Sequence, residues 1–513
     1  MRQGVNPFLI AMVVGLASFM EVLDISIANV SLRHIAGSLS AGQEESTWVL
    51  TSYLVANAIV LPMSGWFSML LGRRRFYIIS IILFTASSLL CGLAPSLGWL
   101  IFFRVLQGLG GGALQPVSQS IVSDAFPPEQ RGMAMAIYGM SVVAAPAIGP
   151  TLGGWITDNY SWHWIFLINV PIGIALSILA RMLIRDPEAL VAARKAKLRD
   201  AFEIDYAGFA LIAIGLGALQ IVLDKGQQED WFESGFIITL TLISAAALVM
   251  TVFWELRHRH PIVNLRLLRD RNFSVGMVFM FMLGFVLLGS TVLLPLMTQT
   301  LLGYTPTAAG MVLSPGGIAI MFLMPVVGAL VSRVDSRGLI LFGLSTVAAS
   351  MFYMGTLDLN VDFNTLVWAR IFQTVGIAFL FIPINAAAYT NVDPAEGGNA
   401  SALINLMRNI GGSVGISLLS TLLARGAQQH QTQLVDRFTP LDPVYSSTMQ
   451  TLTQQLGDPA AAQGMLYGLM QKQATMLSFI DDFHLLGVCI LLIIPLLLLM
   501  GRVRPGAAME VGH

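Results

Sequence analysis

Two carboxylic acids stand one helical turn apart inside the first long apolar run of the sequence. Glu21 and Asp24 interrupt a stretch that is otherwise apolar from residue 8 onward. A carboxylate at mid-membrane depth costs about 2.5–3.5 kcal/mol on insertion scales, so it is tolerated only where it faces protein or water. The i, i+3 spacing places both acids on one face of a helix, and we expect them to share one environment.

An arginine inside another apolar run is the expected partner of these acids. Arg104 lies in the middle of the fourth such run. Burial and a neighbouring acid favour the protonated form of a carboxyl group, whereas a neighbouring arginine favours the ionised form. A carboxyl group under both influences can exchange protons near neutral pH, so Asp24, Glu21 and Arg104 are the predicted proton-coupling residues. The alternative is a permanent Asp24–Arg104 ion pair that only fixes the packing.

Further polar side chains inside apolar runs are expected either to line a substrate cavity or to join helices by hydrogen bonds. These side chains are Asn29, Asn57, Gln107, Gln115, Gln299, Asn385 and Asn405. Arg370 lies in a later apolar run without an evident acid, and we assign it to structure or to substrate contact. Arg408 lies near a helix end, where snorkelling of its charge to the membrane interface is expected.

Proline and glycine are concentrated in the fifth apolar run. The residues are Pro146, Gly149, Pro150, Gly153 and Gly154. Proline frees a backbone carbonyl and kinks a helix, while glycine lets another helix approach closely. The segment is therefore predicted to form a hinge or a tight seal between helices.

The composition places these residues in a membrane. The sequence is 55% apolar and only 11% charged, against about 25% charged residues in a soluble domain. Apolar runs of roughly 20 residues, each long enough to span about 30 Å of hydrocarbon, recur from residue 8 to residue 502. We expect an all-α membrane protein with fourteen spans. Cys91 and Cys489 lie in apolar segments, and the histidines are scattered, so neither a disulfide framework nor a metal site is expected.

Charge in the loops predicts the orientation. With an even number of spans both termini lie on one side, and most of the 28 Lys and Arg residues fall in loops and tails on that side. Basic loops remain in the cytoplasm, so both termini are predicted to be cytoplasmic. The net charge of −1 makes no case for binding nucleic acid.

A long polar segment, 426–480, precedes the last predicted span, 482–502. Helices are expected over 446–456 and 460–479. Apolar residues recur within the second of these helices at Met465, Leu466, Leu469 and Met470, which gives an amphipathic face that would need a partner.

An internal repeat relates the two ends of the chain. Arg104-Val-Leu-Gln107 recurs as Arg370-Ile-Phe-Gln373, an offset of 266 residues (370 minus 104). We expect two six-helix halves, 1–185 and 273–513, with a linker at 186–272 that contains two additional transmembrane helices. Halves of this kind enclose a binding site near the membrane midplane that is reached alternately from each side.

These features together resemble the major facilitator superfamily, and within it the fourteen-helix drug:proton antiporters of the EmrB/QacA type. The matching features are Leu23-Asp24-Ile25-Ser26-Ile27-Ala28-Asn29-Val30, Arg104-x-x-Gln107-Gly108, the antiporter motif Gly149-Pro150…Gly153-Gly154 and the two inserted helices. The resemblance implies proton coupling at Asp24 and Arg104 and a leak-proof seal at the antiporter motif.

The same resemblance implies a function. It implies proton-coupled efflux of hydrophobic drugs and toxic small molecules by alternating access across the bacterial inner membrane, with the proton gradient in place of any cofactor. It also implies an EmrA-like periplasmic adaptor and a TolC-like outer-membrane channel as partners. One departure concerns the loop after Gly65, where the family usually has an Asp and this sequence has Met69; Ser332 stands at the second copy of this position. The usual latch of the cytoplasmic gate is therefore absent or rebuilt.

Other functions remain as alternatives. A proton-driven exporter of a specific metabolite, siderophore or cation would share these features, and a membrane sensor would lack coupled proton flux. A membrane-embedded enzyme would need a nucleophile–base pair or a metal site at mid-membrane depth, and the sequence offers neither. The sequence contains no Gly-x-x-x-x-Gly-Lys-Ser/Thr loop, which argues against an ATP-driven pump.

Overall fold

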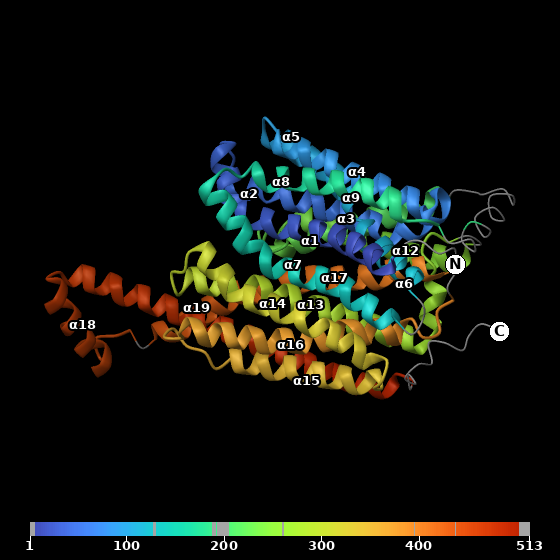
Figure 1. Cartoon of the computed structure of the whole chain (residues 1–513). Helices are drawn as coiled ribbons and strands as arrows, with labels where there is room; N and C mark the ends of the chain where they lie inside the picture. The colour runs from blue at the N-terminus through green and yellow to red at the C-terminus, as the bar shows by residue number, and fades with distance from the viewer. Residues whose placement is uncertain are drawn as a thin grey trace.

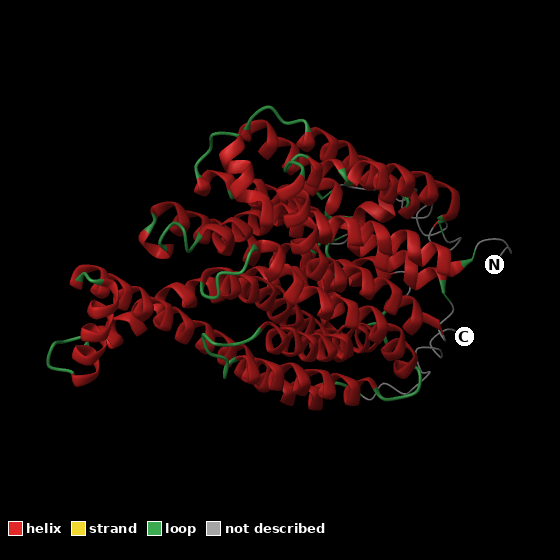
Figure 2. Ribbon diagram, turned by 60° about the vertical axis from the view of Figure 1, so that its left-hand side comes forward, coloured by secondary structure: helices red, strands yellow, loops and turns green. Residues whose placement is uncertain are grey.

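The computed structural model describes residues 6–126, 130–186, 191, 205–258, 261–393, 396–436 and 438–501. These residues form helices joined by short loops, with no strand among them (Figure 2). Polar residues begin several spans by accepting a backbone N–H of the first turn: Asn6 caps the first helix, and Asp270 caps the helix that opens the second half. The basic residues of the loop between 192 and 204 lie outside the described residues.

We use the predicted boundaries to name the two halves. The N-terminal half contains α1 (Pro7–Ser38), α2 (Gln43–Ser46), α3 (Trp48–Leu71), α4 (Arg73–Gly92), α5 (Leu97–Gly111), α6 (Leu114–Ala125), α7 (Arg131–Asn159), α8 (Trp164–Leu167) and α9 (Asn169–Leu183). The linker contains α11 (Tyr206–Lys225), η2 (Trp231–Glu233), α12 (Gly235–Arg257) and η3 (Leu265–Arg269). The C-terminal half contains α13 (Arg271–Thr300), α14 (Pro306–Val331), α15 (Ser336–Met354), α16 (Phe363–Ala388), α17 (Gly397–Val435), α18 (Pro443–Leu456), α19 (Pro459–Ile493) and η5 (Ile494–Leu499).

The number of spans agrees with the sequence. Among the described residues 13 helices are long and apolar enough to cross a membrane, or up to 14 when the bent α7 counts as one span. The chain is therefore an all-α, multi-pass membrane protein. α5 and α6 together make one of these spans, 97–125, and a break near Gly112 separates them.

The helices form a bundle whose two ends differ (Figure 1). We call the end where α1 starts and α3 ends the basic end, because Arg73, Arg74 and Arg75 follow α3 there. α18 and the first part of α19 project beyond the bundle at the opposite end, which we call the hairpin end. The basic end is the one that the charge pattern predicts to be cytoplasmic.

The last span differs from the prediction. We expected separate helices over 460–479 and 482–502, whereas α19 runs without interruption from Pro459 to Ile493. No proline or glycine falls between Phe479 and Asp482 to end the helix. α17 is similarly long: its 39 residues extend about 58 Å at 1.5 Å per residue, so both helices continue past the hydrocarbon at the hairpin end.

We call the chain that lies beyond the bundle at the hairpin end, from the last part of α17 through α18 to the first part of α19, the extension. The amphipathic face predicted in the α19 part of this extension is divided between two environments. Met470 is buried, whereas Met465 and Leu469 are 50% and 45% exposed. α18 packs against α19 but contains no buried residue. The extension therefore presents apolar side chains outward instead of enclosing all of them.

The inserted helix α11 lies against helices of both halves. It packs on α3 and also on α17. Lys225 donates to Thr47, just before α3, and Gln220 accepts a hydrogen bond from Ser413 of α17 at 3.1 Å. Trp231 of η2 donates to Thr421 of α17 at 3.0 Å. The insertion thus bridges the two halves toward the hairpin end.

Candidate functional site: a buried acid pair and a polar seam

Asp24 and Arg104 form an ion pair in the interior of the N-terminal half. Arg104 Nη1 lies 2.5 Å from Asp24 Oδ2, and both side chains are fully buried. Gln107 and Asn169 donate to Asp24 Oδ1 at 2.9 and 2.7 Å. The first residue of α9 thus completes the set of donors around this carboxylate, which faces protein and not lipid, as its cost in a membrane requires.

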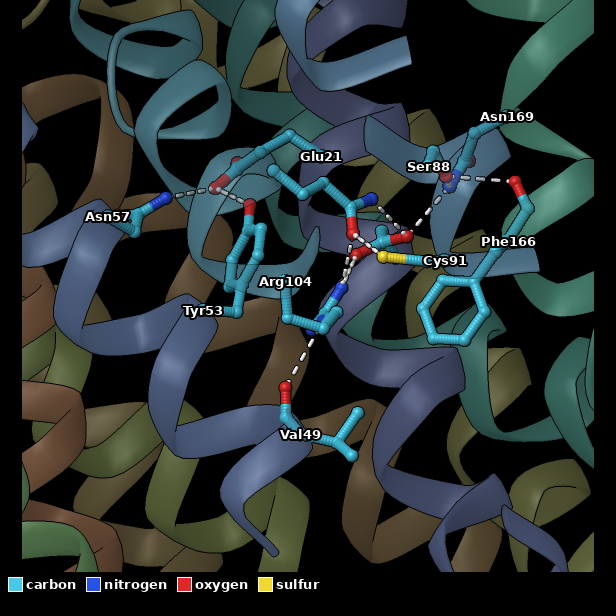
Figure 3. A network of polar contacts seen from close by, with 11 residues as sticks. Glu21, Val49, Tyr53, Asn57, Ser88, Cys91, Arg104, Phe166 and Asn169 are labelled. Carbon is cyan, nitrogen blue, oxygen red and sulfur yellow. Dashed lines mark hydrogen bonds and ion pairs between the residues drawn. The ribbon is translucent and has the colours of Figure 1, made fainter. Parts of the chain in front are cut away.

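Arg104 is held by several groups besides Asp24 (Figure 3). Its Nε donates to the Val49 carbonyl at 2.9 Å, and Nη1 also donates to Gln107 Oε1 at 2.8 Å. The guanidinium carbon lies 4.3 Å from the centre of the Tyr53 ring, within cation–π range. Arg104 therefore has contacts that keep it in place when the charge on Asp24 changes.

Glu21 occupies a different environment from Asp24, so the expected shared environment is wrong. Its carboxylate accepts hydrogen bonds from Tyr53 at 3.2 Å, from Asn57 at 3.0 Å and from Gln115 at 2.5 Å. The three-residue offset turns Glu21 toward α3 and α6, whereas Asp24 points toward α5 and α9. Tyr53 joins the two networks, because its hydroxyl donates to Glu21 while the face of its ring contacts the Arg104 guanidinium (Figure 3).

The Glu21 network continues into the C-terminal half. Gln115, which donates to Glu21, also accepts a hydrogen bond from Arg408 of α17. Arg408 is only 5% exposed, so the expected snorkelling to the membrane interface is wrong. The reason is that α17 packs against α6 here and buries this part of its surface. Glu21 and Arg408 are thereby connected across the boundary between the halves through one amide.

A second group of amides crosses the same boundary one turn further along α6. Gln119 donates to Asn385 of α16 at 2.6 Å and accepts from Asn405 of α17 at 2.6 Å. Ser401 of α17 donates to Gln119 at 3.0 Å. We call Gln115, Gln119, Asn385, Ser401, Asn405 and Arg408 the polar seam.

The structure brings most of the predicted polar residues together. Asn57, Gln107 and Gln115 belong to the acid networks, and Asn385 and Asn405 belong to the polar seam. Asn29 and Gln299 are exposed and lie outside both. Four contributors were missed: Asn169 and Tyr53 of the acid networks, and Gln119 and Ser401 of the polar seam. Asn169 stands as a single amide in an apolar run, the same signal that identified Asn57.

The antiporter motif packs α7 against α1 next to the acids. α7 bends by 46° between Gly132–Pro146 and Ile148–Asn159. Gly149 lies against Ser26, and a β-carbon at Gly153 would stand 3.0 Å from the Ile27 Cα. Pro146, Pro150 and Gly154 are buried. The bend and the close approach are the local effects expected of proline and glycine, and they fix the segment of α1 that follows Asp24; whether the segment acts as a hinge or a seal stays a prediction.

Glycine contacts close the basic end between the halves. Gly65 of α3 lies against Asn399 and Gly398 of α17, and Gly132 of α7 lies against Gly328 of α14. Position 69 near the end of α3 is Met, and Arg73 forms an ion pair with Asp124 at the end of α6, within the N-terminal half.

A repeated arginine motif, buried acids and a polar seam between two helical halves are typical of membrane transporters. The chain belongs to the Major Facilitator Superfamily, whose family model matches residues 14–416. The fold agrees: the proton:xylose symporter XylE superimposes with a TM-score of 0.59 over 94% of this chain and 94% of the other, at 14% identity.

Two relatives at higher identity are an exporter and a resistance protein by name. The chain is 36% identical to the multidrug export protein EmrB of Escherichia coli (strain K12), over 92% of this chain and 90% of that protein. It is 37% identical to the fatty acid resistance protein FarB of Neisseria gonorrhoeae, over 94% of each chain. The recognition of the family from its motifs is confirmed.

Proposed function

We propose that this transporter exports hydrophobic drugs and toxic small molecules across the bacterial inner membrane in exchange for protons, with both termini cytoplasmic. The Asp24–Arg104 ion pair carries the proposal, because a buried carboxylate in a membrane span marks a proton or substrate path. The names of the EmrB and FarB relatives support the substrate class. The alternative is export of one specific metabolite, siderophore or cation.

Proton uptake would act on the polar seam through the acids. A proton on Asp24 removes the charge that Arg104 and Asn169 now bind, and a proton on Glu21 removes the charge that Gln115 binds. Gln115 is also the acceptor of Arg408, so weakening its bond to Glu21 loosens one contact between the halves. The two halves can then rock about the site, which is alternating access in this family of folds.

Transport into proteoliposomes tests the function. Purified protein in vesicles with an acidic lumen is expected to accumulate neutral hydrophobic drugs while a lumenal pH dye reports proton loss. One proton moving through about 150 mV provides roughly 3.5 kcal/mol, enough for a gradient of a few hundredfold for a neutral substrate. Drug binding without any substrate-dependent proton flux would identify a sensor and overturn the proposal. Proton flux with a single metabolite and with no drug of a broad panel would favour the specific exporter.

We further propose that the extension at the hairpin end binds an EmrA-like adaptor, which continues to a TolC-like outer-membrane channel. In this extension Leu441 and Val444 are 92% and 73% exposed, and apolar side chains of this kind are common at the centre of protein interfaces. The periplasm is the compartment that the charge pattern assigns to this end.

Charge substitution of this surface tests the adaptor proposal. Leu441→Asp together with Val444→Asp is expected to lower co-purification with the co-expressed adaptor at least about tenfold, since burying unpaired charge at an interface is costly. Proteoliposome transport should be unchanged. Gln450→Asp, at an exposed polar position of α18, is the matched control. Equal recovery of adaptor with the double variant and with the control would refute this surface.

A further inference from the structure

The C-terminal half contains a second buried arginine cluster that repeats the arginine and glutamine of the Arg104 cluster. Arg370 Nη1 donates to Gln373 Oε1 at 2.6 Å, as Arg104 does to Gln107. Gln373 Nε2 donates to Ser290 Oγ at 2.6 Å, as Gln107 does to Asp24. In both halves 80 residues separate the arginine from its partner on the first helix of the half. Ser290 therefore occupies the place that Asp24 has in the N-terminal half.

Because a serine stands where the N-terminal half has Asp24, Arg370 has no counter-charge among the described residues. Besides Gln373, Arg370 donates to the hydroxyls of Ser290 at 3.1 Å and Thr291 at 2.9 Å, and all these acceptors are neutral. Within the described part of the chain no carboxylate forms an ion pair with Arg370, and its Nε has no partner. The residue is 1% exposed. An arginine keeps its charge in proteins, and a buried charge is costly unless something pairs with it.

The cluster lies beside the contact between the halves. A β-carbon at Gly316 of α14 would stand 3.2 Å from Arg370 Cγ. α14 is the helix that packs against α7 of the N-terminal half, and Ser314 exchanges a hydrogen bond with Thr151 at 3.0 Å. Ser314 and Thr291 are only half-buried. Thr291, which accepts a hydrogen bond from the guanidinium, is therefore the part of the cluster that is accessible to a molecule from outside the helix interior.

We propose that Arg370, with Gln373, Ser290 and Thr291, binds the carboxylate of an amphipathic substrate during transport. A guanidinium presents parallel N–H donors that match the two oxygens of a carboxylate, and such pairs are the stronger hydrogen bonds in proteins. The inference rests on the proposed export function and names one class of substrate for it.

Equilibrium dialysis with protein in phosphatidylcholine nanodiscs tests the site without any proton gradient. The probes are naphthoate and its neutral amide, which share one ring system and differ in charge. Arg370→Gln is expected to weaken naphthoate binding about tenfold to a hundredfold, since hydrogen bonds to a charged group are lost. Binding of the amide should be unchanged.

Substitution of Ser290 gives an answer that does not depend on removing the arginine. Ser290→Asp rebuilds the ion pair of the N-terminal half, so naphthoate binding should fall as it does in Arg370→Gln. Ser290→Asn adds a similar volume without charge and should keep naphthoate binding. If Ser290→Asp and Ser290→Asn bind naphthoate equally well, the inference is wrong.

Two further outcomes separate a substrate site from a lipid site and from a failure of export. Naphthoate bound by the wild type but displaced when phosphatidylglycerol replaces part of the lipid would place a lipid headgroup in the site and overturn a substrate role. Drug export with proton flux, but no charge-dependent binding of naphthoate, would reject the carboxylate site and leave the export function standing. Absence of proton-driven export would instead reject the function, while the binding measurement would still report on Arg370.

Discussion

Replacing Asp24 by Asn is expected to abolish proton-driven accumulation of substrate. Asparagine has nearly the same shape as aspartate and can still bond to Gln107 and Asn169, but it neither carries charge nor takes up a proton. For a neutral substrate the accumulation ratio should fall from a few hundredfold, which one proton at about 150 mV can sustain, to about one. The measurement is uptake of a neutral drug by proteoliposomes with an imposed gradient, together with the lumenal pH change.

Two other substitutions in α1 are compared with Asp24→Asn in the same transport measurement. Glu21→Gln keeps a side chain that can bond to Tyr53 and Asn57 but removes the charged acceptor of Gln115, so we expect slower transport, by about tenfold for one charged hydrogen bond. Ser26→Ala removes a long contact of 3.4 Å to the Pro146 carbonyl but keeps the β-carbon that lies against Gly149, so it should transport like the wild type. Uphill accumulation by Asp24→Asn at the level of Ser26→Ala would rule out Asp24 as the coupling residue and leave the ion pair with a packing role.

Replacing Gly328 by Leu is expected to hold the basic end open. A β-carbon at Gly328 would stand 2.7 Å from the Gly132 carbonyl oxygen, too close for van der Waals contact, so α7 and α14 must separate. Overpacking of this kind costs about 1–3 kcal/mol, which shifts the balance between the closed and open forms roughly tenfold to a hundredfold. Transport should fall by a similar factor, since each cycle must pass through the closed form.

Labelling of a seam cysteine distinguishes opening from misfolding in this variant. Ser401→Cys, in a background with Cys91 and Cys489 replaced by serine, places a thiol at a fully buried position of the polar seam. Gly328→Leu should accelerate its reaction with a hydrophilic maleimide. Gly338→Leu is the control, because a β-carbon there meets nothing within 4 Å. Slow labelling in both variants would show that the glycine contact does not govern closure.

The class of fold and the centre of the site could be predicted from the sequence because both depend on polarity. In a chain so rich in apolar residues, each charged residue inside a span is conspicuous, and this contrast alone is enough to pair Asp24 with Arg104. The repeated Arg-x-x-Gln motif likewise related the two halves of the chain. Helices that continue for a full membrane thickness are well predicted, since hydrocarbon leaves the backbone no other partner than itself.

The remaining contacts of the site depend on which helices face each other, and the residue pattern along one helix does not contain that information. Glu21 and Asp24 lie one turn apart, yet their neighbours come from different helices. Arg408 was assigned to the membrane interface because it stands near a helix end, whereas the packing of α17 on α6 buries it. Asn169 was overlooked because a single amide in an apolar run does not reveal which acid it will reach.

The position of α11 has a consequence for how a lipophilic molecule can approach the transporter. This helix lies alongside α3 and α17. Its Lys225 donates to Thr47, just before α3, and its Gln220 accepts a hydrogen bond from Ser413 of α17. A compound that diffuses within the membrane therefore meets α11 on this flank of the bundle, between α3 and α17. Lateral entry between α3 and α17 would require α11 to separate from one of these two helices.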